Sequence, residues 1–377
     1  MRRALELAAQ GEGDTAPNPR VGAILVRGGE IVAEGWHQRY GGPHAEVNCL
    51  ADAAAKGVAP SECVMYVTLE PCNHYGKTPP CSKAVYEAGI RKVFVGCADP
   101  NPHVEGGGAD FLRERGVDVT VGVLERECLD MIADFRLWQA TRRAYLILKM
   151  AATLDGKIAA RTGHSAYVSC PASLARVQKL RRMCGAVLVG GGTFRTDDPR
   201  LTVRGKDGKP EGRQPLAVVA TQSLPRAGED RHLLRERPQE TIFWTDAVSA
   251  TSDAADGLRE AGVRIWDLGP RGAMDFGLGL TRLRQECGCH HVLCEGGGGL
   301  AMSLLARDLM DEMRLFLAPK VLGDETAVSL FSGRALETMT EALRLRFAGV
   351  RPSGDDLLLT LRPAGDERFT LPEKPLE

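Results

Sequence analysis

Apolar runs alternate with amphipathic segments over the first part of the chain. Residues 23–35 contain two apolar runs around a Gly-Gly turn, which predicts a β-hairpin. The elements predicted after it are helix 44–57, strand 63–71, helix 82–89, strand 92–100, helix 109–116, strand 117–123 and a long helix 125–143. This helix–strand alternation predicts a three-layer α/β/α domain.

The pattern restarts at residues 141–156 with a new apolar strand, so we place a domain boundary near residue 143. Predicted elements downstream are helix 172–185, strands 186–192, 215–221 and 241–246, a strand with a glycine run at 290–299, helix 300–313 and an antiparallel hairpin 343–363. The sequence therefore predicts one domain over residues 1–143 and a second α/β domain, with a mixed sheet, over residues 144–364. Residues 365–377 are rich in proline and charge, which predicts a loose tail.

Composition narrows the class of protein. The 48 Lys and Arg residues nearly balance 49 Asp and Glu, so no basic field favours nucleic acid. No apolar run approaches the roughly 18 residues of a membrane span, and residues 1–11 predict a short amphipathic helix rather than a signal peptide. The 11 cysteines are scattered, unlike those of a secreted disulfide scaffold. We therefore expect a cytoplasmic protein that binds neither nucleic acid nor membrane.

Residues with metal-binding chemistry gather around the first predicted helices. His44 and Glu46 fall where helix 44–57 begins, Cys72 follows a predicted strand, and Cys81 precedes the next helix. One imidazole and two thiolates suit a catalytic zinc that keeps one position open for water. Bound zinc lowers the pKa of that water to about 7. Glu46, beside the ligands, is placed to transfer protons.

The order His-x-Glu, then Pro-Cys, then Cys is the signature of zinc deaminases. Here eight residues separate Cys72 from Cys81, where Cys-x-x-Cys is common. Two other interpretations remain, a structural zinc site and unrelated buried thiols. A structural site usually has four protein ligands. The Glu beside the His and the Pro before the first Cys favour the deaminase.

Four motifs restrict which family of zinc deaminases the chain resembles. In chain order they are PNPRVG, GWHQRYGGPHAE, EPCNHYGKTPPC and CADPNPHVEGGG. Together they resemble the deaminase domain of the bifunctional riboflavin-biosynthesis deaminase/reductase family, over about residues 1–143. The resemblance implies a cytidine-deaminase-like fold and a pyrimidine substrate with a 5′-phosphate. It implies that Lys77, between the two cysteines, binds this phosphate. The other implied substrate contacts are Asn18, His37, His74, Asp99 and Asn101.

Some of these residues have purely structural interpretations. Asn18 and Asn101 stand beside prolines and suit turns. His37 suits a hydrogen-bonded histidine of the core.

Two glycine runs follow predicted strands in the second domain, at residues 190–192 and 296–299. Glycines there let backbone N–H groups approach a phosphate at a helix N-terminus. Neither run has the G-x-G-x-x-G fingerprint, so a Rossmann domain is not supported. A glycine-rich turn without a ligand is the alternative.

The segments LKMAATLDGKIA, VGGGTFRTDDPRLTVR and EGGGGLAMSLL resemble the reductase domain of the same family, over about residues 144–364. The resemblance implies a dihydrofolate-reductase-like α/β fold, NADPH as cofactor and a homo-oligomer. The implied NADPH contacts are Ala151, Tyr167, Thr193, Asp197, Gly297, Gly298, Gly299, Leu300, Ala301, Met302 and Ser303. The implied substrate contacts are Ser165, Arg181, Leu201, Arg204 and Glu295, with Arg181 and Arg204 as a phosphate clamp.

The resulting hypothesis is a bifunctional enzyme of riboflavin synthesis. The first domain would deaminate 2,5-diamino-6-ribosylamino-4(3H)-pyrimidinone 5′-phosphate, and the second would reduce the ribosyl group to ribityl with NADPH. Two rivals are a nucleic-acid deaminase with an appended domain, and a deaminase whose C-terminal domain only binds or assembles. The charge balance and Lys77 oppose the first. The second is opposed by the presence of the implied cofactor and substrate contacts Thr193, Asp197, Arg204 and Glu295.

Overall fold

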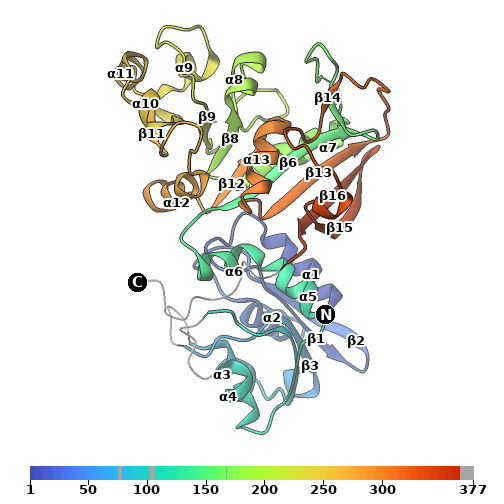
Figure 1. Ribbon diagram of the computed structural model, residues 1–377. Helices are drawn as coiled ribbons and strands as arrows, with labels where there is room; N and C mark the ends of the chain where they lie inside the picture. Colours follow the sequence, from blue (N-terminus) through green and yellow to red (C-terminus); the bar gives the residue numbers. More distant parts are fainter. Residues whose placement is uncertain (75–78, 102–106, 167, 366–377) are drawn as a thin grey trace. The chain divides into compact units, whose positions relative to one another are not determined.

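The computed structural model describes residues 1–74, 79–101, 107–166 and 168–365 (Figure 1). The chain divides into two compact units, one formed by Met1–Thr141 and the other beginning at Arg142. Lys77 and Tyr167 lie outside the described residues, as does the predicted tail from residue 366 onward. No helix in the described part of the chain is long and apolar enough to cross a membrane.

The first unit is built on a five-stranded sheet in the order β2-β1-β3-β4-β5. Its strands are β1 (Gly22–Arg27), β2 (Glu30–Trp36), β3 (Val64–Leu69), β4 (Lys92–Cys97) and β5 (Asp118–Val121). β1 pairs antiparallel with β2 and β3, whereas β3, β4 and β5 run parallel. Parallel strands end at the same edge of the sheet, so the loops after β3 and β4 lie side by side there.

Helices complete the predicted three layers of this unit. They are α1 (Arg2–Ala8), α2 (Ala45–Ala55), α3 (Cys81–Glu87), α4 (Gly108–Arg113), α5 (Glu125–Met131) and α6 (Ala133–Ala140). α1 contacts α5, while α3 contacts both α2 and α4. Gly35 on β2 allows α2 close approach, because a Cβ there would lie 2.2 Å from the backbone nitrogen of Cys49.

The prediction of one long helix over 125–143 is wrong. α5 ends at Met131 and α6 begins at Ala133, with Ile132 between them at φ −107° and ψ 22°. Ile132 is 1% exposed. Its burial in the core fixes a break that the local periodicity does not indicate.

The second unit is built on a nine-stranded sheet in the order β11-β10-β9-β8-β12-β6-β13-β16-β15. The strands are β6 (Tyr145–Thr153), β8 (Ala186–Gly190), β9 (Leu216–Ala220), β10 (Thr241–Thr245), β11 (Arg264–Asp267), β12 (His291–Cys294), β13 (Glu312–Ala318), β15 (Leu345–Ser353) and β16 (Asp356–Pro363). β7 (Lys157–Ala159) and β14 (Val328–Ser329) pair separately. All neighbours in the large sheet are parallel except β13–β16 and β16–β15, which confirms the mixed sheet and the C-terminal hairpin.

Helices of the second unit connect these strands. They are α7 (Pro171–Met183), α8 (Gly191–Asp197), α9 (His232–Glu236), α10 (Ala247–Ala250), α11 (Asp253–Glu260), α12 (Phe276–Cys287) and α13 (Gly298–Ala306). Two boundaries differ from prediction. The glycine run after β8 opens α8 instead of extending the strand, and α13 ends at Ala306, so that the last residues of the predicted helix begin β13. The central strands are buried on both faces and therefore read as continuous apolar runs. The alternation of apolar and polar residues that would mark their ends is missing from the sequence.

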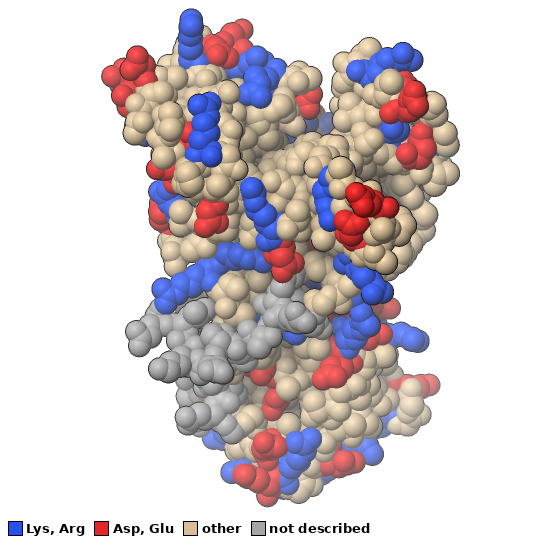
Figure 2. All heavy atoms as spheres, in the orientation of Figure 1, with Lys and Arg blue, Asp and Glu red and all other residues tan. Residues whose placement is uncertain are grey.

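Charged side chains of both signs are interspersed over the face of the molecule drawn in Figure 2. This distribution agrees with the near balance of acidic and basic residues in the sequence.

Candidate active sites

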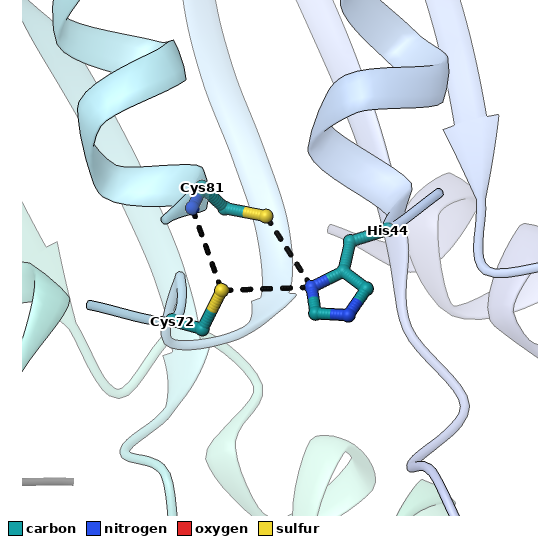
Figure 3. Close-up of side chains that lie close together, drawn as sticks. All are labelled: His44, Cys72 and Cys81. Atoms are coloured by element: carbon teal, nitrogen blue, oxygen red, sulfur yellow. Dashed lines mark hydrogen bonds between the residues drawn. The ribbon is translucent and has the colours of Figure 1, made fainter. Parts of the chain in front are cut away.

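Three side chains with metal-binding atoms converge in the first unit (Figure 3). His44 is the N-cap residue of α2, Cys81 is the first residue of α3, and Cys72 lies in the loop after β3. His44 Nδ1 lies 3.3 Å from Cys81 Sγ and 3.6 Å from Cys72 Sγ. The three ligand atoms lie within 4.8 Å of one another. Three distant parts of the chain therefore supply one cluster.

The cluster favours a thiolate. A hydrogen bond from the Cys81 thiol, together with the His44 ring and the Cys81 backbone N–H, lowers the pKa of the Cys72 thiol well below its usual range. Donation of that hydrogen bond and burial raise the pKa of the Cys81 thiol. The two sulfurs thus share a proton that a cation would replace, because metals bind thiolates. Two sulfurs and one imidazole nitrogen form a donor set that fits zinc with one open position.

Glu46 lies in the first turn of α2, two residues after His44. It is only 3% exposed, and its carboxyl group is hydrogen-bonded with the side chain of Cys81. Burial raises the pKa of Glu46 to about 7. A carboxyl group with such a pKa can both accept and release a proton near neutral pH. The metal-binding cluster therefore has a proton carrier directly beside it.

Asn18 and His37 lie together next to this cluster. The His37 ring meets the His44 ring edge-on, with 5.4 Å between centroids. His37 Nδ1 lies 2.9 Å from the Pro43 carbonyl oxygen, so it carries the proton, and Nε2 then accepts from Asn18 Nδ2 at 3.1 Å. Burial lowers the pKa of His37 and keeps the ring neutral. Both predicted substrate contacts are thus held in fixed orientations beside His44.

A carboxylate that the sequence analysis did not single out organises the next loop. Glu70 follows β3, and its side chain accepts hydrogen bonds from the backbone N–H of Asp99 at 3.2 Å and of Ala109 at 2.9 Å. Asp99 in turn accepts from the Asn101 N–H at 2.9 Å. A Cβ at Gly107 would lie 2.2 Å from Glu70 Oε1, which explains a glycine there. Glu70 therefore positions Asp99 and Asn101, the predicted contacts after β4.

Asp99 is mostly buried, and burial raises its pKa to about 6. The loop between the two cysteines is anchored at both ends, since Ser82 Oγ donates to Asn73 Oδ1 at 2.7 Å and Ser82 N–H donates to the Cys72 carbonyl at 3.1 Å. His74, the predicted contact inside this loop, is exposed.

The two glycine runs of the second unit face each other. A Cβ at Gly297, the N-cap of α13, would lie 3.8 Å from Thr193 Oγ1 on α8. A Cβ at Gly190 would lie 3.7 Å from the Cβ of Leu300. A Cβ at Gly192 or Gly299 would meet nothing within 4 Å, so the backbone there is open to a ligand. Two predicted cofactor-binding segments thus meet at the carboxyl ends of β8 and β12.

A mostly buried ion pair lies near these segments. The Arg181 guanidinium binds the Glu295 carboxylate in two places, Nε to Oε1 at 2.6 Å and Nη2 to Oε2 at 2.9 Å. Lys149 Nζ lies 4.0 Å from Glu295 Oε2. Burial alone would raise the pKa of Glu295, but the Arg181 charge holds it below its usual range, and burial lowers the pKa of Lys149. The Glu295 carboxylate therefore lies between the Arg181 guanidinium and the Lys149 amine.

Comparison with known proteins identifies both units. Residues 144–359 match the family model described as the RibD C-terminal domain, and residues 1–97 match the cytidine and deoxycytidylate deaminase zinc-binding region. The riboflavin biosynthesis protein RibD of Aquifex aeolicus is 37% identical over 95% of this chain and 96% of its own length. The chain belongs to the RibD family. RibD of Actinobacillus pleuropneumoniae is 36% identical over 95% of this chain and 93% of its own.

Solved RibD structures agree with this assignment. A diaminohydroxyphosphoribosylaminopyrimidine deaminase/5-amino-6-(5-phosphoribosylamino)uracil reductase from Thermotoga maritima has a TM-score of 0.73, 34% identity and coverage of 97% of each chain. RibD of Acinetobacter baumannii has a TM-score of 0.71 with 32% identity, covering 97% of this chain and 98% of its own. The family confirms a bifunctional riboflavin-biosynthesis enzyme with a zinc-binding deaminase domain and an NADPH-dependent reductase domain.

The two arginines of the predicted phosphate clamp differ in their surroundings in this structure. Arg181 is committed to Glu295 and to the Thr202 carbonyl, which accepts from Nη1 at 2.9 Å. Arg204 is exposed, and only its backbone N–H is bonded, to Gln178 Oε1, in the described part of the chain. Arg204 therefore suits a phosphate contact better than Arg181 does.

Leu201 has a left-handed backbone conformation, φ 49°, which is uncommon for a residue other than glycine. The buried Arg237 holds it there, because Nη1 donates to the carbonyls of Arg200 at 3.0 Å and Leu201 at 3.2 Å. Strain of this kind persists where neighbouring contacts fix it, often at functional sites.

The remaining predicted reductase residues are dispersed around the glycine runs. Ala151 lies on β6 beside Phe316 of β13, Ser165 is exposed in a loop, and Asp197 ends α8. On α13, Ala301 is buried in the core and Met302 lines an apolar cavity with Leu305 and Phe331. The Ala301 side chain is therefore closed to a cofactor, whereas the Met302 side chain reaches this cavity. Ser303 Oγ accepts from Arg307 at 2.9 Å.

Lys149 was missed in the sequence analysis, although it interrupts the apolar strand LILKMA. A lysine is rarely buried without a partner, so a single lysine in a buried strand predicts an ion pair with an acidic residue.

Proposed function

We propose that His44, Cys72 and Cys81 hold the zinc of the deaminase and that Glu46 carries its protons. Bound zinc supplies a Lewis acid that makes water a nucleophile at neutral pH. Glu46 would take up the proton that this water releases as its oxygen bonds to C2 of the diaminopyrimidine phosphate. It would deliver that proton to the 2-amino group, which leaves as ammonia when its bond to C2 breaks. The buried carboxyl group two residues from His44 carries this proposal.

We infer that Asn18, His37, Asp99 and Asn101 bind the pyrimidine and its sugar. Asn18 and His37 approach the cluster from one side, and Glu70 fixes the loop of Asp99 and Asn101. Their hydrogen-bonding groups are oriented before substrate arrives, which reduces the entropy cost of binding.

We propose that the second unit binds NADPH across Thr193, Asp197 and the start of α13. NADPH supplies the hydride that converts the ribosyl group to ribityl. The backbone N–H groups from Gly297 onward suit its pyrophosphate, since a helix N-terminus attracts anions. The proximity of Gly297 to Thr193 supports an intact cofactor site, in contrast to the alternative of a binding or assembly module. A homo-oligomer and a cytoplasmic location stay predictions from the sequence.

Replacing Lys77 by Ala tests the proposed phosphate contact. A charge-assisted hydrogen bond contributes about 1.5–3 kcal/mol, so kcat/KM for the phosphorylated substrate should fall roughly 10-fold to 100-fold. Turnover of the dephosphorylated nucleoside should hardly change. Deamination kinetics on both substrates provide the measurement, with Lys83→Ala on α3 as a matched control. Equal losses on both substrates would mean that Lys77 acts on the fold or the chemistry.

A further inference from the structure

Asp155 lies in the motif TLDG at the end of β6, and neither proposed site gives it a role. Its carboxylate accepts three hydrogen-bond donors: the Thr153 hydroxyl at 2.6 Å, the Leu322 N–H at 3.2 Å and the Gly323 N–H at 2.9 Å. These bonds lower the pKa of Asp155 to about 2, so the group is ionised at neutral pH. Asp155 therefore ties the turn after β6 to the chain that follows β13.

We call residues 320–330 the strap. It has little regular structure, and β14 is its only strand among the residues that the structure describes. Backbone bonds fasten both of its ends to the same turn, Leu154 N–H to the Lys320 carbonyl at 2.7 Å and Leu330 N–H to the Gly156 carbonyl at 2.9 Å.

Lys157 is a second fastener. Its Nζ donates to the carbonyls of Glu325 at 3.3 Å and Ala327 at 3.2 Å and to Ser329 Oγ at 3.3 Å. Asp155 and Lys157 thus hold the strap with opposite charges at two points, an anion on backbone N–H groups and a cation on backbone carbonyls.

The far side of the strap lies on the start of α13. A Cβ at Gly298 would lie 2.7 Å from the Ser329 carbonyl oxygen and 3.0 Å from that of Leu330. Just beyond the strap, Phe331 lines a cavity with Met302 and Leu305 of α13. Gly298 is therefore enclosed by the strap on one side, while Gly297 faces Thr193 on the other.

We propose that Asp155 is a positioning residue for NADPH, because it seats the strap against Gly298 and so fixes the backbone N–H groups at the N-terminus of α13. This inference rests on the proposed cofactor site at residues 297–303. Asp155 touches no reacting atom in this scheme. Its loss should weaken cofactor binding and leave the chemical step unchanged.

Asp155→Asn removes the charge and presents an NH₂ group to backbone N–H groups that need an acceptor. Asp155 is exposed and acts on the cofactor site only through the strap, so we expect a modest effect, about a 3-fold to 10-fold rise in the Kd and KM for NADPH. kcat for reduction of the deaminated intermediate should stay within about twofold. NADPH fluorescence titration of the full chain gives Kd independently of turnover. Asp253→Asn, an exposed carboxylate on α11 of the same unit, is the matched control.

Lys157→Met provides the second variant, and it should also raise the Kd if the strap acts as a unit. An unchanged Kd in Asp155→Asn that keeps the wild-type unfolding temperature would overturn the proposal, as would an equal loss in kcat. If Asp155→Asn does not fold, an unchanged Kd in Lys157→Met overturns it instead. Asp197→Ala distinguishes a failure of the strap inference from a failure of the proposed cofactor site. If it weakens NADPH while both strap variants do not, the strap inference fails alone, and if it has no effect, the proposed cofactor site fails.

Discussion

Replacing Glu46 by Gln is expected to lower deamination about 10²-fold to 10⁴-fold, the usual contribution of a general acid/base. Gln keeps the volume of the buried side chain but cannot take up and release a proton. Zinc should stay bound, because Glu46 is not among the three ligand side chains. Ammonia release and metal content of the purified variant provide the two measurements.

The same variant should reduce the deaminated intermediate at the wild-type rate when this compound is supplied directly. The proposed reductase residues all lie in the unit that begins at Arg142, whereas Glu46 lies in Met1–Thr141. Glu62→Gln, an exposed carboxylate of the first unit, is the control for both assays. Loss of NADPH oxidation in Glu46→Gln would mean that the two sites are coupled.

The double variant Cys72→Ser/Cys81→Ser should lose both zinc and deamination. The hydroxyl of Ser remains protonated at neutral pH and is a poor ligand for zinc, whereas the pKa of the Cys72 thiol is lowered within the cluster. We expect metal analysis after gel filtration to fall from one zinc per chain to near zero, with ammonia release falling in parallel.

Cys63→Ser is the matched control for this variant. Cys63 is a buried thiol of the same unit that donates to the Ala59 carbonyl at 3.5 Å and is not among the three ligand side chains. Zinc and ammonia release should both persist in it. Stoichiometric zinc in the double variant would show that the metal is held elsewhere.

Much of the zinc site could be predicted from sequence because each ligand is placed by local structure. His44 caps a helix, Cys81 starts another, and Cys72 follows a strand, and all three boundaries are readable from apolar periodicity. Parallel pairing of β3 with β4 then fixes the edge of the sheet at which the loops meet.

The rest depends on contacts between distant segments. Glu70 is recognised as a positioning group only when the N–H groups of Asp99 and Ala109 are seen to point at it. Arg181 resembles a phosphate ligand in sequence, yet Glu295, 114 positions away, occupies its guanidinium. The helix break at Ile132 lies in the core, and no local residue preference indicates it.

The most direct test of the account is the stoichiometry of the two half-reactions on the full chain. The diaminopyrimidine phosphate is supplied with NADPH, and ammonia release and NADPH oxidation are followed together. We predict that the two are equimolar, and that NADPH oxidation requires deamination first. Ammonia release without NADPH oxidation, even with the deaminated intermediate added, would contradict the account and make the second unit a binding or assembly module.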